Sequence, residues 1–423
     1  MSQGIAFGAR LFALRDGTTK PDRVNHTEIV KLPCKTGIVS VVVFEALCST
    51  VLPTIQRSRR LMSLDTFRGI AIACMILANN PGTWGAIYPP LRHAEWHGCT
   101  PTDLIFPSFL FAAGVAMAFS LSQYITSHAT SEPVGWRILR RCTLLFVLGV
   151  ILNGFPYYSW ETLRILGILQ RISLAYLIAA LVVLNLSVAR QWLFAIAVLV
   201  GYQIAMQLIP VPGFGAGDLS PEGNLAAFID RTILGSPHLW QRGPFDPEGL
   251  LATLPASVTV LMGYFTGDWL RRQLFDRGTS LRMAIAGIAC IISGWLWGFG
   301  FPINKALWTS SFVLFSGGWA LLLFAICYQL ADVWNWRSWA FPFKVFGLNA
   351  IFLFFASGIV SRLLVRIPVR WQGDTLSLKM WLYKTIFQPL GNMEGSLAFA
   401  IVTVVIWWFV LYGLYRKGVF FKV

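Results

Sequence analysis

Long apolar runs dominate the chain and alternate with short polar connections from Ser63 onward. Ten such runs can be counted, each close to the roughly 20 residues that an α-helix needs to cross a bilayer. They cover about residues 64–81, 103–123, 139–157, 165–186, 190–210, 249–270, 282–301, 306–330, 341–364 and 395–415. The pattern predicts an all-α fold, a polytopic transmembrane bundle of about 10 helices.

The first 60 residues fit this pattern less well. An apolar run from about Thr36 to Ile55 contains Glu45 and has basic residues on both sides, so charge gives it no orientation. It is an eleventh helix, a signal-like segment or sequence upstream of a misassigned start, and the sequence leaves these alternatives open. We therefore treat residues 1–60 as an N-terminal extension and residues 61–423 as the transmembrane domain.

Composition agrees with a membrane protein, because 56% of the residues are hydrophobic, 13% are charged and the mean hydropathy is +0.63. The formal net charge is +15, but the basic residues form short clusters between apolar runs. Such clusters set membrane topology, so they predict the lipid bilayer as a partner and no nucleic acid. The seven cysteines contain no CxxC pair and no histidine at metal-ligand spacing, which predicts neither a disulfide framework nor a metal site.

Arginine and lysine indicate the orientation of the bundle. They are more frequent in the connections on the side where the first run begins, so this side is predicted to face the cytoplasm. The loop that contains His93 then lies outside, in a periplasm or lumen. The loop from Arg362 to Lys384 is the exception, with five basic residues on the outer side. The two longest outer segments, residues 211–248 and about 365–394, are expected to cap the outer face.

The loop between the first two runs carries the main candidates for chemistry. His93 and His97 are four residues apart, and Trp96 and Asp103 lie close in sequence. A histidine at a membrane surface can exchange a proton near neutral pH or attack a thioester through a ring nitrogen. The alternative is a hydrogen-bonded histidine at the interface. A metal is not predicted, because no third ligand stands at a suitable spacing.

Polar residues at the ends of other runs are further candidates. Asn79 and Asn80 end the first run, where paired amides can orient a carbonyl or bind sugar hydroxyls, or simply stop a helix before Pro81. Arg164 and Arg171 border and enter an apolar run. Arg171 must therefore face protein or water, and it either binds an anionic ligand or pairs with a buried carboxylate.

Two carboxylates and two short polar segments complete the set. Asp246 and Glu248 open the sixth run, where one can pair with Arg171 or orient a histidine, or both can complement the helix dipole. The segment PINKALW (302–308) brings together the amide of Asn304, the ammonium of Lys305 and the indole of Trp308. This indole can stack on a sugar or adenine ring or belong to an interfacial belt. Asn349 lies within the ninth run and needs a partner or a ligand.

Eight motifs in this order resemble the heparan-α-glucosaminide N-acetyltransferase family, a family of polytopic acyltransferases that includes bacterial relatives. The likeness runs from about Arg60 to Val423. The motifs are SLDTFRG (63–69), HAEWHG (93–98), TDLIFPSFLF (102–111), RILGILQR (164–171), FDPEGLL (245–251), PINKALW (302–308), GLNAI (347–351) and LYRKGVFFKV (414–423).

The resemblance implies transfer of an acetyl group from cytoplasmic acetyl-CoA, as co-substrate, to the amine of a glucosamine-type sugar across the membrane. The family's catalytic histidine falls in the HAxW motif and so corresponds to His93, as nucleophile or general base. Asn79 or a loop amide is the expected donor to the thioester oxygen, with Asp103 as a further catalytic residue. Arg164 and Arg171 are expected to hold CoA phosphates or to form structural ion pairs.

The resemblance has limits on the acceptor side. The large luminal domain that precedes the membrane part in animal enzymes is not expected in this chain, and His97 stands where the animal motif has asparagine. Heparan sulfate is therefore not assigned as the substrate. The alternatives are a membrane O-acyltransferase of a glycan or lipid-linked sugar, and a transporter of sugars or lipid-linked intermediates. The expected location is the plasma (inner) membrane if the chain is bacterial, and a homodimer is one option for its assembly.

Overall fold

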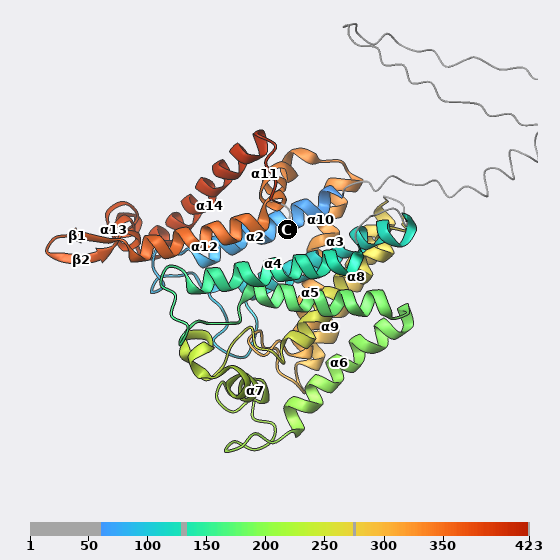
Figure 1. Cartoon of the computed structure of the whole chain (residues 1–423). Coiled ribbons are helices and arrows are strands. Elements are labelled where there is room, and N and C mark those ends of the chain that lie inside the picture. Colours follow the sequence, from blue (N-terminus) through green and yellow to red (C-terminus); the bar gives the residue numbers. More distant parts are fainter. Residues whose placement is uncertain (1–60, 128–132, 274–275, 422–423) are drawn as a thin grey trace, which may run out of the picture. The chain divides into compact units, whose positions relative to one another are not determined.

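The computed structural model describes residues 61–127, 133–273 and 276–421, so the apolar run predicted at 36–55 lies outside the described residues. The described part is built mainly of helices (Figure 1). These are α2 (Met62–Asn79), α3 (Ile105–Ser127), α4 (Val134–Gly154), α5 (Ile168–Asn185), α6 (Val188–Leu208), α7 (Leu225–Leu234), α8 (Thr253–Leu270), α9 (Arg277–Trp297), α10 (Ser310–Tyr328), α11 (Arg337–Leu348), α12 (Ala350–Arg366), α13 (Leu378–Leu382) and α14 (Asn392–Arg416).

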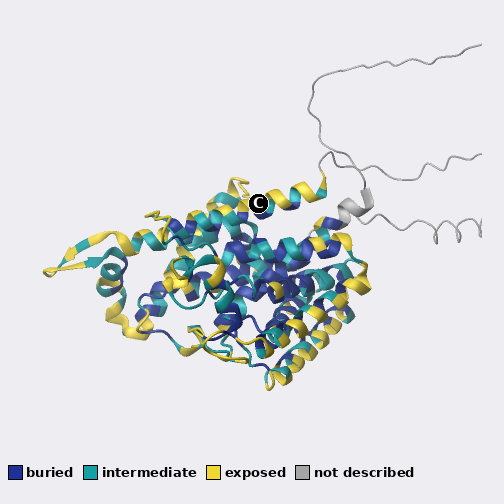
Figure 2. Cartoon of the chain, turned by 60° about the horizontal axis from the view of Figure 1, so that its bottom comes forward, coloured by how far each residue is buried: buried dark blue, intermediate teal, exposed yellow. Residues whose placement is uncertain are grey.

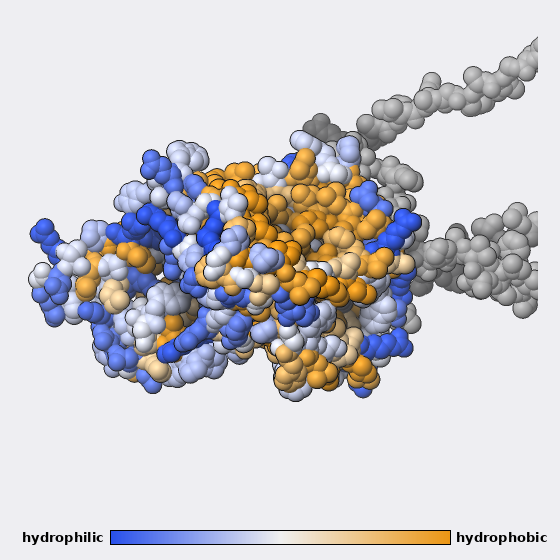
Figure 3. Space-filling view, turned by 90° about the horizontal axis from the view of Figure 1, so that it is seen from below, coloured by the Kyte–Doolittle hydropathy of each residue, from blue (hydrophilic) through white to orange (hydrophobic). Residues whose placement is uncertain are grey.

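Among the described residues, seven helices are long and apolar enough to cross a membrane, namely α2, α3, α5, α6, α9, α10 and α14. A bent pair, α11 with α12, raises the number to eight if it forms one span. The predicted count of about 10 is therefore not confirmed, although the chain has the helices of a multi-pass membrane protein. Figure 3 shows a broad apolar area on one face, with hydrophilic residues on the hairpin side and along the opposite edge.

Two helices at predicted runs depart from the simple pattern for different reasons. Helix α4 contains Arg137, Arg140 and Arg141 in its first half. Helix α8 contains three threonines, a serine and an aspartate, yet much of its surface is buried against other helices. A helix surrounded by protein does not need an apolar surface to be stable in a membrane, because its polar groups find partners there.

The ninth predicted run is broken. Helices α11 and α12 meet at Asn349 with a bend of 67°. The Asn349 side chain is buried, donates from Nδ2 to the carbonyl of Val419 (3.1 Å) and accepts from the amide of Phe421 (2.9 Å). The partner that an amide in this run needs is thus the C-terminal segment, which holds the bend in place.

Five helices form a closed ring. Helix α2 packs on α3, α3 on α5, α5 on α4, α4 on α12, and α12 returns to α2. Figure 2 shows buried residues concentrated in the middle of the bundle and exposed residues along its rim and on the hairpin. The ring matters for function, because the candidate site opens into it.

The outer segments are only partly helical. In residues 209–252, α7 packs through Leu225 and Ala226 against Tyr202 of α6 and Phe301. Strands β1 (Pro368–Trp371) and β2 (Asp374–Ser377) form an antiparallel hairpin in which Pro368 pairs with Ser377. The expectation of an all-α protein therefore holds for the bundle and is wrong for this short hairpin.

Helices α2 and α11 approach closely at two glycines. A Cβ atom on Gly347 would overlap the carbonyl oxygen of Asp65, and one on Gly69 would overlap that of Phe343. Replacing Gly347 with alanine is therefore expected to cost about 1–3 kcal/mol of stability through overpacking. Thermal unfolding in detergent measures this loss.

A matched control for that substitution is Gly413→Ala in α14, where an added Cβ meets no atom within 4 Å. Alanine has the higher helix propensity, so this variant is expected to melt at or slightly above the wild-type temperature. An equal loss of stability in both variants would contradict the close packing of α2 on α11.

Candidate functional site

His93 and Asp103 form the centre of the site. The loop from Thr100 turns into a short 3₁₀ helix at Pro101–Leu104, and Asp103 closes a capping box with Thr100. Its Oδ2 accepts hydrogen bonds from the backbone amides of Ala94 and Thr100 and from the Thr100 hydroxyl, all at 3.0 Å. Its Oδ1 lies 2.6 Å from His93 Nδ1. The carboxylate is buried, whereas the His93 side chain is 46% exposed.

The contacts of Asp103 determine where the proton on His93 resides. Every other group around the carboxylate is a donor, so Asp103 acts only as an acceptor. A 2.6 Å contact to an acceptor requires the proton on Nδ1 of His93. When the ring is neutral, the other ring nitrogen, Nε2, carries the free lone pair. A histidine held in this tautomer by a carboxylate can act as a base or as a nucleophile.

Lys305 joins this pair from a distant part of the chain. Its Nζ lies 3.1 Å from Asp103 Oδ1 and 3.0 Å from His93 Nδ1. The sequence indicated Lys305 only as a binding residue, and the structure adds its contact with both members of the pair. The ammonium stabilises the buried carboxylate, since a buried charge needs a partner of opposite sign.

The loop that carries Lys305 is fixed by its neighbour Asn304. Asn304 is fully buried, and its Oδ1 accepts from the amide of Leu307 (2.9 Å). The Gly98 amide donates to the carbonyl of Ile303 (2.7 Å), and Asn304 Nδ2 lies 3.3 Å from His97 Nδ1. Burial lowers the pKa of His97, which favours its neutral ring. These contacts hold the His93 loop and the Lys305 loop together.

Trp96 packs beneath the His93 loop. Its indole N–H donates to the carbonyl of Leu219 (2.8 Å), and its ring meets Phe245 edge-on with centroids 4.9 Å apart. Trp96 therefore ties the loop to the outer segments at residues 219 and 245.

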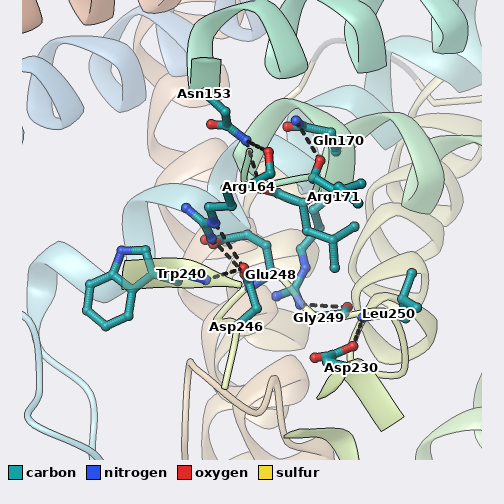
Figure 4. A network of polar contacts seen from close by, with 12 residues as sticks. Asn153, Arg164, Gln170, Arg171, Asp230, Trp240, Asp246, Glu248, Gly249 and Leu250 are labelled. Carbon is teal, nitrogen blue, oxygen red and sulfur yellow. Dashed lines mark hydrogen bonds and ion pairs between the residues drawn. The ribbon is translucent and has the colours of Figure 1, made fainter. Parts of the chain in front are cut away.

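Arg164, Asp246 and Glu248 form a second polar cluster, which Figure 4 shows from close by. Arg164 donates from Nε and Nη2 to the two oxygens of Asp246 (2.9 and 2.6 Å) and from Nη2 to Glu248. Asp246 also accepts from the amides of Trp240 and Glu248 (both 2.9 Å). The prediction allowed a pair between one carboxylate and Arg171, whereas the ion pairs in the structure are with Arg164.

The segment before α5 is extended, and side chains satisfy its carbonyl groups. Asn153 Nδ2 donates to the carbonyls of Arg164 (3.0 Å) and Leu166 (2.9 Å). Gln170 Nε2 donates to the carbonyl of Ile165 (3.0 Å). These bonds fix the backbone that presents Arg164, and Figure 4 shows both amides pointing toward it.

Arg171 is fully buried and lies apart from the ion pairs. Its Nη2 donates to the carbonyl of Gly249 (3.2 Å), and its guanidinium lies over the ring of Trp308 at 5.1 Å. Trp308 is fully buried and also contacts Phe106 and Phe312 edge-on. Its ring is therefore packed by protein, so it has no free face for the predicted stacking on a ligand.

Asp230 of α7 adds a buried carboxylate near this point that the sequence did not single out. Its Oδ1 accepts from the amide of Leu250 (2.8 Å), and burial raises its pKa to about 7. The signal available in the sequence was its place as an acidic residue within the largely apolar stretch Leu225–Leu234.

Two cavities lie next to these groups inside the ring of helices. The first, about 90 Å³, is lined by His93, Lys305 and Glu248 and by apolar residues of α2, α3, α5 and α12. The second, about 300 Å³, is lined by more polar residues: Asn79, Asn80, Asn153, Arg164, Gln170, Ser357, Ser361 and Arg362 are among them. Both cavities share Met75, Asn79, Ile168, Leu169 and Phe354, so they adjoin.

Several of these cavity residues were missed by the sequence analysis. Ser357, Ser361 and Arg362 come from α12, and Asn153 ends α4. A signal was present, because Ser357 and Ser361 are four residues apart and share one face of an apolar helix. Asn80 lines the larger cavity and donates to the carbonyl of Ile76, while Asn349 and Trp308 line neither cavity.

The Arg164 cluster predicts a difference between two aspartate substitutions. Asp246→Asn leaves Arg164 short of a buried partner, which typically costs about 3 kcal/mol of stability. Asp268→Asn breaks partly exposed pairs with Arg271 and Arg272 (both 2.7 Å), for which less than about 1 kcal/mol is expected. Thermal unfolding in detergent compares the two variants. A loss for Asp268→Asn as large as that for Asp246→Asn would contradict this account.

The arrangement of His93, Asp103 and Lys305 is suited to acyl transfer. No group of three or more histidine, cysteine or carboxylate side chains able to hold a metal occurs among residues 61–421 as far as they are described. The site offers a histidine held by a carboxylate and an ammonium, next to a cavity that His93, Lys305 and Asn79 line.

Comparison with known proteins shows similarity to one family. A family model described as heparan-alpha-glucosaminide N-acetyltransferase, catalytic, matches residues 60–296. The chain is 28% identical over 425 residues to the Homo sapiens protein named heparan-alpha-glucosaminide N-acetyltransferase, covering 86% of this chain and 60% of that protein. The Mus musculus protein of the same name is 27% identical over 432 residues, covering 88% and 62%. The chain thus spans about 60% of the length of these curated relatives.

Proposed function

Because this chain belongs to the heparan-alpha-glucosaminide N-acetyltransferase family, we propose that it moves the acetyl group of acetyl-CoA onto the amine of an amino sugar across a membrane. The donor enters from the cytoplasm and the acceptor from the opposite side. In a bacterial cell the membrane would be the plasma membrane. The observation that carries the proposal is the His93–Asp103 pair, whose histidine lines a cavity between membrane helices.

In the direct route, His93 acts as a general base. The amine nitrogen of the sugar attacks the thioester carbonyl carbon while Nε2 takes a proton from that nitrogen. The tetrahedral intermediate then collapses, the carbon–sulfur bond breaks, and the imidazolium returns the proton to the departing thiolate. Asp103 stabilises the imidazolium formed between these steps, because its Oδ1 holds the Nδ1–H.

In the two-step route, His93 is the nucleophile. Nε2 attacks the carbonyl carbon and the carbon–sulfur bond breaks, which expels CoA as a thiolate and leaves an acetyl-imidazolium whose Nδ1–H stays on Asp103. The sugar amine then attacks the acetyl carbon and the bond to Nε2 breaks. The freed Nε2 takes the proton that the amine loses and passes it to the thiolate. Both routes need the same tautomer, so the geometry of His93 is compatible with either.

Negative charge develops on the thioester oxygen in both routes. Asn79 lines both cavities, and its amide is a neutral donor candidate for this oxygen. Lys305 acts as a positioning residue, because its ammonium holds the carboxylate that orients His93. Glu248 lines the His93 cavity and accepts a hydrogen bond from Arg164.

The two cavities suggest a division between donor and acceptor. The smaller cavity is mostly apolar and runs from His93 to Ile72 and Phe109, which suits the thioester arm of acetyl-CoA. The larger cavity offers amides, hydroxyls and two arginines, which suit a sugar. We assign the thioester to the first cavity and the sugar to the second.

Reconstituted liposomes provide the test. Labelled acetyl-CoA is supplied on one face and glucosamine is trapped on the other, with protein of known orientation. Free CoA and trapped N-acetylglucosamine are expected. An acetyl ester in place of an amide would indicate an O-acyltransferase, and sugar flux that does not require acetyl-CoA would indicate a transporter; either result would overturn the proposal.

A further inference from the structure

A third cavity, of about 580 Å³, lies between α6, α8 and α9 and shares no lining residue with the two cavities at His93. We call it the α6–α9 slot. Its floor is buried and is formed by Phe111, Ala195 and Val258. Its rim is exposed and includes Ile196 of α6 and Ala286 of α9. The slot is therefore a recess that opens on the membrane-facing surface of the bundle.

The lining of the slot is apolar apart from one end. Thr266 is satisfied internally, because its hydroxyl donates to the carbonyl of Met262 (2.9 Å). Arg282 is the one charged residue in the lining, and it lies in the second turn of α9. Near this end, the rings of Trp192 and Phe265 stack with centroids 4.1 Å apart and hold α6 against α8. The slot thus combines an apolar interior with a single guanidinium at its arginine-rich end.

The length of the slot matches one leaflet of a bilayer. Its lining extends along α8 from Val258 to Trp269 and along α9 from Arg282 to Cys290. At 1.5 Å per helical residue these distances are about 17 and 12 Å. Half of the hydrocarbon core of a bilayer is about 15 Å. A chain that enters beside Arg282 would therefore reach the far end of the slot near the middle of the membrane.

The slot does not favour a helix. A helix is about 10–12 Å wide with its side chains, so only part of one could lie within a recess of about 580 Å³. A non-helical peptide is also disfavoured, because the lining offers few partners for backbone polar groups. An acyl chain has no such groups and is narrow enough to enter.

We propose that the α6–α9 slot binds one acyl chain of an anionic phospholipid whose phosphate lies against Arg282. Lipid tails and protein side chains are similarly apolar, so the chain is held by close packing rather than by a hydrophobic driving force. The phosphate adds directional hydrogen bonds to the binding, because guanidinium and phosphate form charge-assisted hydrogen bonds. Arg277 and Arg190, at the starts of α9 and α6, add positive charge at the same end.

Photocross-linking of the full chain tests this proposal. The protein is placed in vesicles of phosphatidylcholine and phosphatidylglycerol with a trace of phosphatidylglycerol that carries a diazirine on its acyl chain. After irradiation, adducts are mapped by peptide mass spectrometry. Adducts are expected to concentrate on Met262, Met283 and Cys290 of the slot relative to Phe409 on the exposed face of α14.

Three variants sharpen the test. Ala286→Trp fills the slot and is expected to abolish the concentrated adducts, whereas Ile288→Trp, exposed on the same helix outside the slot, is expected to keep them. Arg282→Gln should weaken labelling by phosphatidylglycerol about fivefold. Thermal unfolding checks that each variant is folded, and only folded variants are compared.

Distinct outcomes would overturn the proposal. Adducts spread evenly over the exposed apolar faces, or concentrated adducts that survive Ala286→Trp, would show that the slot does not select a lipid chain. A photoreactive amino acid placed at position 286 tests the alternative occupant: cross-links from it to residues 1–60, or to a second copy of the chain, would show that protein fills the slot instead.

Discussion

Replacing His93 with alanine is expected to lower the rate of acetyl transfer by about 10³-fold, since a positioned base or nucleophile contributes on the order of 10²–10⁴. The imidazole supplies the lone pair on which both proposed routes depend, and alanine leaves no group in its place. The rate of N-acetylglucosamine formation in liposomes measures the effect. His93 is partly exposed at the site, so the folded bundle is expected to survive the change.

A second histidine provides the control for this substitution. His238 also lies among the outer segments, and its Nδ1 contacts the carbonyl of Leu163 at 2.8 Å rather than a carboxylate. His238→Gln is expected to retain activity within a few-fold. If His93→Ala retained most of the wild-type rate while remaining folded, His93 would have no part in the chemistry.

Asp103→Asn is expected to lower the rate by about 10²–10⁴-fold through the tautomer of His93. The amide oxygen of the new side chain would turn toward the three donors at Ala94 and Thr100, because they require an acceptor. The NH₂ group would then face His93 Nδ1 and force it to accept. The proton would move to Nε2 and remove the reactive lone pair.

Nitrogen NMR of the labelled protein separates this effect from a loss of folding. Wild type is expected to carry the His93 proton on Nδ1, and Asp103→Asn on Nε2. A variant with the shifted tautomer and the wild-type rate would contradict the role of Nε2. A variant with the wild-type tautomer and a low rate would contradict the orienting role of Asp103.

The helices were predictable from the sequence where they form long apolar runs. Helices α2, α3, α5, α9 and α10 lie close to their predicted runs, because apolar length is what a membrane requires. The break at Asn349 was not predictable, since it depends on bonds from Val419 and Phe421, some 70 residues away. Hydropathy reports neighbouring residues in the chain and not distant partners.

In the candidate site, too, contacts between residues close in sequence were predictable and contacts between distant residues were not. His93 and Asp103 are 10 residues apart, so their proximity could be expected from one loop. Lys305 is 202 residues from Asp103, and nothing local indicated their contact. The choice of Arg164 over Arg171 as the partner of Asp246 depends on the extended backbone before α5, which Asn153 fixes from another helix. Chain separation, rather than residue type, limited the prediction.

The hydrogen bonds that join Asn349 to Val419 and Phe421 of the C-terminal segment have a practical consequence. Helix α12, which begins at that asparagine, supplies a wall of both cavities at His93. Truncation before Val419 would remove both hydrogen bonds of Asn349, so the bend between α11 and α12 would no longer be fixed. Truncated variants are therefore expected to lose acetyl transfer activity before they lose their fold. Affinity tags are accordingly better attached at the amino end.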